Sequence, residues 1–259
     1  MLPDLTTLQR IDEPLERMLQ RIARWMRTDF VNDSGNQVYG VEVDGRRWFI
    51  KHADRPDRVA SFRRAEALYA AVDHPALPAL RNAFDTPTGR ALLYEWVEGE
   101  PLREAAPRAR WEALSVAERL SGVGAILDLH VAIAEAGFVA EDLYDGCFLY
   151  DFASHRMWVC DLDEYRPGPY RLDRDRTYGS TRFRAPEEYR RGARLDERTT
   201  VFNLARVAAV LLGDRAGRRD AFTGPDSLWS VIAVATAAAA ADRYATVRGF
   251  VEAWMAAAH

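Results

Sequence analysis

The chain has 259 residues, of which 48% are hydrophobic and 29% are charged, and its formal net charge is −4. This composition is that of an ordinary globular protein and excludes disordered, collagen-like and coiled-coil classes. The acidic balance also argues against a nucleic-acid partner. Lys51 is the single lysine, so 34 of the 35 basic residues are arginine. Such a bias is typical of a GC-rich genome, in which lysine is kept where a compact ammonium is needed, so Lys51 is the first candidate functional residue.

Two further absences concern the compartment. No window approaches the roughly 18 apolar residues that a membrane span needs. The two cysteines, Cys147 and Cys160, have neither metal-ligand spacing nor the number needed for a disulfide framework. We therefore expect a cytoplasmic protein without a membrane span.

The first part of the chain is rich in predicted strands. Apolar residues at helical spacing predict a helix from Leu15 through Arg27, after the start signal at Pro14. The elements expected next are a turn cluster over 32–36, a strand over 38–43, a hairpin turn at Asp44-Gly45, a return strand over 46–52, a helix over 59–72 and strands over 80–85 and 90–96. A small antiparallel sheet with one main helix follows from this order.

Beyond Gly99 the pattern becomes mainly helical. Helices are expected at about 111–136, 199–213, 227–240 and 246–257, with a hairpin of strands over 148–150 and 157–160 between them. The alanine run 237–241 is interpreted as part of a buried helix. The organisation predicted is α+β in two lobes: an N-terminal helical extension over 1–29, a first lobe over 30–96 and a second lobe over 97–259.

Several side chains could carry chemistry. Lys51 ends an apolar strand, and Glu66, in the helix that follows it, is well placed to pair with it. Asp142 and Asp161 come before and after the predicted hairpin, so both reach the same end of it. Carboxylates placed in this way hold a metal ion or accept a proton. His130 is interpreted as a packed core histidine rather than a general base.

In this order the motifs resemble those of the protein kinase superfamily, in particular a divergent, compact bacterial serine/threonine kinase. Lys51 matches the strand lysine, Glu66 the helix glutamate, Asp142-Leu143 the catalytic loop, Asp161 the metal-binding aspartate and Ala185-Pro186-Glu187 the A-P-E element. The resemblance implies a two-lobed kinase-like fold. It also implies an ion pair between Glu187 and Arg243.

The resemblance implies that the cofactors are ATP and Mg²⁺ or Mn²⁺. Lys51 would neutralise phosphates, Asp142 would accept the proton of the acceptor hydroxyl, and Asp161 would hold the metal ion. The residues expected to contact the nucleotide are Ser34, Gly35, Asn36, Val38, Lys51, Glu66, Tyr94, Glu95 and Val97.

The chain departs from this family at several positions. Cys147 stands where kinases have a metal-binding asparagine, and a thiol is a poor ligand for Mg²⁺. Either Asp145 or Asp163 supplies the missing oxygen, or one metal suffices, or the protein is a pseudokinase; Asp145-Gly146 is also consistent with a plain turn. Ala140-Glu141 replaces the usual His-Arg, which argues against control by phosphorylation. Thr200 replaces a helix aspartate.

The function predicted is transfer of the ATP γ-phosphate to a hydroxyl of a protein or peptide. The segment between Asp161 and Glu187 is typical of an activation segment, with Thr177, Ser180 and Thr181 as candidate phosphorylation sites. A small-molecule acceptor, as in antibiotic phosphotransferases, and a nucleotide-binding pseudokinase scaffold are the alternatives.

Overall fold

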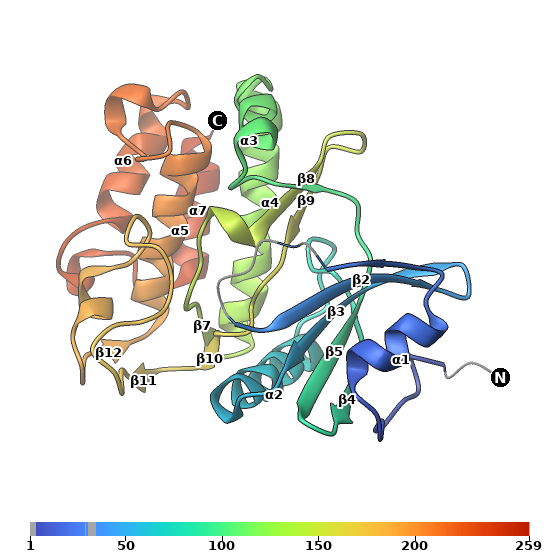
Figure 1. Ribbon diagram of the computed structural model, residues 1–259. Helices are drawn as coiled ribbons and strands as arrows, with labels where there is room; N and C mark the ends of the chain where they lie inside the picture. Colours follow the sequence, from blue (N-terminus) through green and yellow to red (C-terminus); the bar gives the residue numbers. More distant parts are fainter. Residues whose placement is uncertain (1–3, 29, 31–34, 259) are drawn as a thin grey trace. The chain divides into compact units, whose positions relative to one another are not determined.

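The computed structural model (Figure 1) describes residues 4–28, 30 and 35–258. Over these residues the chain forms seven α-helices and twelve β-strands, so the predicted α+β class is confirmed. The described residues fall into two compact units. The first contains those up to Ala71 together with 78–97, and the second contains 72–77 and those from Glu98 onward. None of the described helices has the length and apolar character needed to cross a bilayer.

The first unit is built on a five-stranded sheet in the order β1-β2-β3-β5-β4, and all neighbours pair antiparallel. Its elements are α1 (Leu15–Ile22), β1 (Trp25–Arg27), β2 (Gln37–Val43), β3 (Arg46–Ala53), α2 (Pro56–Ala71), β4 (Leu80–Thr86) and β5 (Gly89–Glu95). The predicted hairpin turn is confirmed, since Asp44 and Gly45 both have positive φ, at 50° and 72°. Two such residues form the turn that suits the twist of the strands.

The two faces of this sheet are covered by different helices. Side chains alternate between the faces of a strand, so Ile50 and Leu93 pack on one side with Leu19 of α1. On the other side, Leu92 packs with Phe62 of α2. Both faces are therefore apolar, and the unit has a core on each side of the sheet.

The structure corrects the expected N-terminal helix. The helix ends at Ile22, because Ala23 has an extended backbone, and Trp25–Arg27 forms β1 against β2. The edge of β2 offers backbone hydrogen bonds that outweigh the helical spacing of Met26. The helix α1 packs in the first core, together with Leu5 and Ile11.

The second unit is mainly helical. Its strands are β6 (Glu100–Pro101), β7 (Phe138–Val139), β8 (Phe148–Asp151), β9 (Arg156–Val159), β10 (Arg166–Pro167), β11 (Tyr170–Arg171) and β12 (Arg194–Leu195). Its helices are α3 (Ala105–Glu112), α4 (Val116–Glu135), α5 (Glu197–Leu211), α6 (Asp226–Ala235) and α7 (Val247–Ala257), with short 3₁₀ turns η1 (Asp145–Cys147), η2 (Pro186–Tyr189), η3 (Arg219–Ala221) and η4 (Ala240–Asp242). The hairpin β8–β9 pairs in the predicted place.

Three expectations about the second unit change. The helix expected over 111–136 is broken before α4, because Ser115 and Glu118 form a capping box that starts a new helix. The alanine run 237–241 is not part of a buried α-helix, since α6 ends at Ala235 and only the last two residues of the run enter the 3₁₀ turn η4. Residues 72–77 join the second unit rather than the first, and Ala76 accepts a backbone hydrogen bond from Val159.

Candidate functional site

Lys51 lies in β3 of the first unit and is almost completely buried, with 8% of its surface exposed. It pairs across the sheet with Val38 on one side and Leu92 on the other. Leu92 belongs to the core beneath α2, so Lys51 shares the face that carries α2 and Glu66. Lys51 and Glu66 therefore belong to the same face of the sheet.

Glu66 has a partner that the sequence did not indicate. Arg90, on β5, donates from Nε to Glu66 Oε1 and from Nη2 to Oε2 at 2.6 Å, and from Nη1 to Asp85 at 2.6 Å. Both carboxylate oxygens of Glu66 thus accept hydrogen bonds from one guanidinium, which fixes the carboxylate under the sheet.

The predicted nucleotide-binding residues lie mostly in the described part of the first unit. Ser34 is outside the described residues. Gly35 has a φ of 79°, which favours glycine, and a Cβ there would meet open space. Asn36 immediately precedes β2, Val38 is the second residue of that strand, and Tyr94 is buried beside Tyr69, with ring centroids 5.3 Å apart.

The segment from Glu95 to Val97 adjoins an aromatic cluster. Trp96 lies edge-on to Trp25, at 5.8 Å between ring centroids, and 6.5 Å from Phe30. Phe30 in turn meets Phe49 of β3 at 5.3 Å. Aromatic faces of this kind can stack against a planar base.

In the second unit Asp142 and Asp161 have the same backbone conformation. Each has a φ of 64°, a left-handed value that non-glycine residues rarely adopt and that clusters at functional sites. Cys147 connects their segments: its Sγ contacts the Asp142 carbonyl oxygen at 3.4 Å, and its carbonyl accepts from the Cys160 N–H at 2.8 Å. The fold thus brings the two predicted acids to one place.

The chemistry of Cys147 decides what can bind a metal ion here. Burial raises the pKa of its thiol well above the ordinary value, and the charges of Asp161 and Asp142 raise it further. A neutral thiol is not a Mg²⁺ ligand. No group of three or more His, Cys, Asp or Glu side chains is arranged as a metal site in the described ranges. Mg²⁺ that also binds nucleotide phosphates needs only one or two carboxylates, and Asp161 is the acid expected to supply one.

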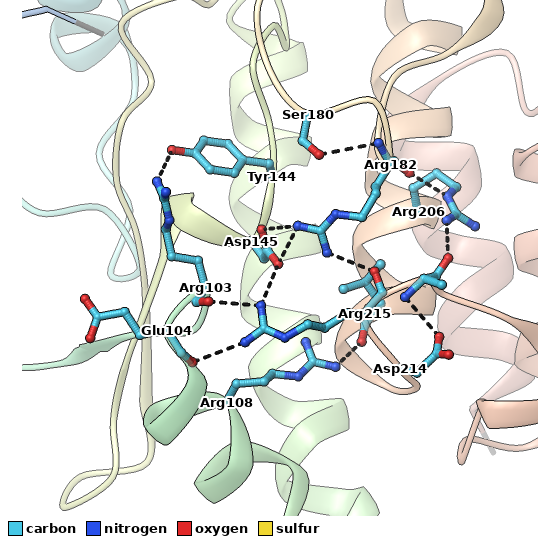
Figure 2. Close-up of polar contacts among 12 residues, drawn as sticks. Arg103, Glu104, Arg108, Tyr144, Asp145, Ser180, Arg182, Arg206, Asp214 and Arg215 are labelled. Atoms are coloured by element: carbon cyan, nitrogen blue, oxygen red, sulfur yellow. Dashed lines mark hydrogen bonds and ion pairs between the residues drawn. The ribbon is translucent and has the colours of Figure 1, made fainter. Parts of the chain in front are cut away.

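Asp145 and Asp163, the two alternative ligands, are both buried. Arg182 donates from Nη2 to both oxygens of Asp145 at 3.0 Å, and Arg215 Nη1 lies 3.9 Å from Asp145 Oδ2. Figure 2 shows both guanidiniums directed at this carboxylate. These contacts fit a structural role for Asp145. A metal-binding role for Asp145 or for Asp163 stays a prediction.

Thr200 supports the loop that leads to Asp142. Its Oγ1 accepts the Ala140 N–H at 3.0 Å, and both residues are buried. The hydroxyl therefore satisfies a backbone donor that would otherwise be unpaired. Thr200 thus provides a hydrogen-bond acceptor at the position where the resemblance implies an aspartate.

Glu141 ties the loop to the segment that follows Asp161. Its fully buried carboxylate pairs with Arg174, accepts from Tyr170 Oη at 2.8 Å and accepts from the Tyr178 N–H at 3.3 Å. An acid thus stands where the resemblance implies an arginine, and its basic partner, Arg174, lies on the segment after Asp161.

The A-P-E glutamate has the partner that was predicted. Arg243 donates from Nη1 and Nη2 to the two oxygens of Glu187 at 2.7 and 3.0 Å, and the side chains are 0% and 7% exposed. Thr199 Oγ1 adds a hydrogen bond to Glu187 at 2.8 Å. The pair joins η2 to η4 and the first turn of α5.

Thr177 does not fit its predicted role as a phosphorylation site. It is 2% exposed, and its hydroxyl donates to Glu188 Oε1 at 2.9 Å. A kinase cannot reach a hydroxyl buried in this way. Ser180 and Thr181 are more accessible.

Gly179 is set against Asp142. A Cβ at residue 179 would lie 2.7 Å from Asp142 Oδ1 and 3.1 Å from its Cα, and the φ of 102° is itself unfavourable for other residues. Glycine is therefore required where the segment passes this carboxylate.

His130 is a core histidine, as expected. It is fully buried, with Nδ1 2.7 Å from the Ile126 carbonyl oxygen and Nε2 2.8 Å from Tyr165 Oη. Burial lowers its pKa to about 4, so the ring is neutral at physiological pH.

The sequence indicated the acids but not the basic side chains around them. Arg103, Arg182 and Arg215 lie far apart in the chain and follow no motif. Comparison with protein-family models found no match, and comparison with curated proteins found none either.

Proposed function

We propose that this protein is a kinase-like phosphotransferase that moves the γ-phosphate of ATP to a hydroxyl of a protein substrate. The sheet with α2, followed by a mainly helical unit, fits the two-lobed fold of that superfamily. The observation that carries the proposal is the convergence of Asp142 and Asp161, both with left-handed backbone, on Cys147.

In this function Asp142 accepts the proton of the attacking hydroxyl. Asp161 holds Mg²⁺, which would neutralise charge on the nucleotide phosphates when bound. Lys51 would neutralise the phosphates further. Glu66 lies on the same face of the sheet as Lys51, and its carboxylate is held by Arg90. Phosphoryl transfer depends mainly on such positioning and charge stabilisation, so each of these groups contributes strongly to the rate.

The Glu141 cluster supports activity without prior phosphorylation. A phosphate on the segment would bring negative charge toward Glu141, which is already satisfied by Arg174 and Tyr170. The contacts that phosphorylation creates in other kinases are here supplied by side chains of the unmodified chain.

One observation favours a second candidate, a nucleotide-binding scaffold with weak or no transfer. The Cys147 thiol is buried and neutral, so it cannot supply the second metal site's oxygen. Under this alternative the protein binds ATP and signals by conformation.

The experiment that separates the candidates uses the full chain with γ-labelled ATP and Mg²⁺ or Mn²⁺. We expect labelling of the protein or of a generic protein substrate, and loss of that labelling in Lys51→Met, Asp142→Asn and Asp161→Asn. Arg248→Gln, an exposed arginine on α7, is the matched control and should label normally. ATP binding without any labelling supports the scaffold, and labelling that survives in all three variants contradicts the proposed site.

A further inference from the structure

Three arginines from separate segments gather around Tyr144 and Asp145 (Figure 2). Arg103 precedes α3, Arg182 lies on the segment after Asp161, and Arg215 lies in the loop after α5. We call them the arginine cluster. Their shared surroundings are Tyr144 and Asp145, which follow Asp142 in the chain.

The contacts of the cluster leave positive charge uncompensated. Arg182 and Arg215 share one carboxylate, that of Asp145, which is 2% exposed. The cluster's other hydrogen bonds go to neutral groups: Arg182 donates to the Arg215 carbonyl at 2.8 Å, Arg215 to the Arg103 carbonyl at 3.0 Å and the Glu104 carbonyl at 3.4 Å, and Arg103 to Tyr144 Oη at 3.5 Å.

The other two acids drawn in Figure 2, Asp214 and Glu104, do not remove this excess. Asp214 accepts from Arg218 Nε at 2.7 Å, so its charge is matched by a fourth arginine. Figure 2 shows the Glu104 carboxylate directed away from the cluster. Burial raises the pKa of the Tyr144 phenol, so it stays neutral and gives Arg103 no counter-charge. Two guanidiniums therefore share the Asp145 carboxylate, and the third, that of Arg103, contacts the neutral Tyr144 hydroxyl.

The cluster is both held in place and accessible. The side chains of Arg182 and Arg215 are 35% and 45% exposed, while Asp145 lies beneath them. A guanidinium has five N–H donors in a planar fork that matches carboxylate and phosphate groups. Hydrogen bonds to backbone carbonyls already fix the orientation of the Arg182 and Arg215 guanidiniums. An anion other than Asp145 therefore binds to them with little further loss of side-chain entropy.

The position of the arginine cluster indicates that it binds the substrate that accepts the phosphate rather than the nucleotide. Gly179 packs against Asp142, and one residue later Ser180 Oγ accepts the Arg182 N–H at 3.4 Å. The segment that carries Arg182 thus passes the carboxylate expected to receive the acceptor's proton. Tyr144, which Arg103 contacts, is two residues beyond that carboxylate.

We propose that the arginine cluster binds an acidic segment of the protein substrate, placing carboxylate or phosphate groups next to the hydroxyl that Asp142 deprotonates. This rests on the proposed function for the identity of the hydroxyl, but not for the binding of the anion. An extended polypeptide suits the cluster because its arginines come from three segments and two of them are open to solvent.

The test measures binding and transfer separately on the full chain. Two fluorescent peptide sets contain one serine or threonine flanked by Asp and Glu or by Lys and Arg. Fluorescence anisotropy without nucleotide gives affinity, and label from γ-labelled ATP gives transfer. The acidic set should bind at least tenfold more tightly, and Arg215→Gln and Arg103→Gln should each weaken it about tenfold. Arg215→Glu should shift preference toward the basic set.

Arg248→Gln should bind the acidic set like the wild type, because it removes an exposed positive charge on α7, outside the cluster. Thermal unfolding identifies any variant that fails to fold, and the other two then carry the test. Equal affinity for the two sets, or acidic binding unchanged in Arg215→Gln and Arg103→Gln, overturns the inference. If the acidic peptides bind and the variants weaken that binding as expected, but no label is transferred, the inference is supported and the proposed function is contradicted. If label is transferred preferentially to the basic peptides, the proposed function is supported and the inference is contradicted.

Discussion

The guanidinium of Arg243 binds both carboxylate oxygens of Glu187 inside the second unit, at 2.7 and 3.0 Å. The same guanidinium donates to the carbonyls of Arg198, Ala237 and Ala238. One buried ion pair therefore links the A-P-E element to α5 and to the segment after α6. Because both charges are removed from water, each depends on the other for its stability.

Replacement of Glu187 by Gln should destabilise the protein strongly, because Arg243 is left as a buried charge without its counter-ion. Breaking one side of a buried pair costs about 3–5 kcal/mol. Urea unfolding of the full chain measures the change. Arg248→Gln breaks an exposed pair with Glu135 and should change stability little. Similar losses in the two variants would contradict the account.

Thr200→Val should lower stability by about 1–3 kcal/mol, because the buried Ala140 N–H loses its acceptor while the side-chain shape is kept. Thr200→Ser keeps the hydroxyl and should recover most of that loss. Transfer activity should fall with Thr200→Val as well, since Ala140 is two residues before Asp142. If Val and Ser behave alike in unfolding and in transfer, the hydrogen bond is not what supports the loop.

Gly179→Ala should reduce phosphoryl transfer by about a hundredfold, because the new Cβ would displace the Asp142 carboxylate by close contact. Gly192→Ala is the matched control. Gly192 also has a positive φ, of 81°, but a Cβ there meets no atom within 4 Å. It should cost about 1 kcal/mol or slightly more in stability and leave transfer unchanged. An equal loss of transfer in the two variants would show that backbone strain, and not the contact with Asp142, lowers the rate.

Glu188 should make the stability of the protein fall as pH rises. Burial raises its pKa from 4.5 to about 7, although Asn203, the Ala185 N–H and Thr177 donate to it and favour the charged form. The folded state keeps a proton that the unfolded chain releases above pH 4.5. Stability is therefore lost between about pH 4.5 and 7, by roughly 3 kcal/mol at 1.36 kcal/mol per pKa unit.

Glu188→Gln removes this titration and keeps a similar shape, so the difference in unfolding free energy between wild type and variant should change over that pH range. Comparing the two chains cancels His130, whose lowered pKa of about 4 makes stability rise between about pH 4 and 6.5. Parallel curves for the two proteins from pH 4.5 to 7 would mean that Glu188 is charged in the folded state.

Much of the fold could be predicted because it depends on neighbours in the chain. The alternation in β2 and β3 and the Asp44-Gly45 turn determine the hairpin that carries Lys51. The helical spacing over residues 59–72 was sufficient for α2, which begins slightly earlier, at Pro56. Met26 shows the limit of this reasoning, since its helical spacing was overruled by the edge of β2.

By itself, then, the sequence predicted the main elements that carry Lys51, Asp142 and Asp161, and the family resemblance implied the pairing of Glu187 with Arg243. Only the tertiary structure decided which arginines meet which acids elsewhere. Arg90 binds Glu66, Arg174 binds Glu141, and Arg182 with Arg215 shares Asp145. The physical reason is that a guanidinium on a long side chain has no preferred sequence separation from its partner. Among 34 arginines, distance in the folded chain alone selects the pairs.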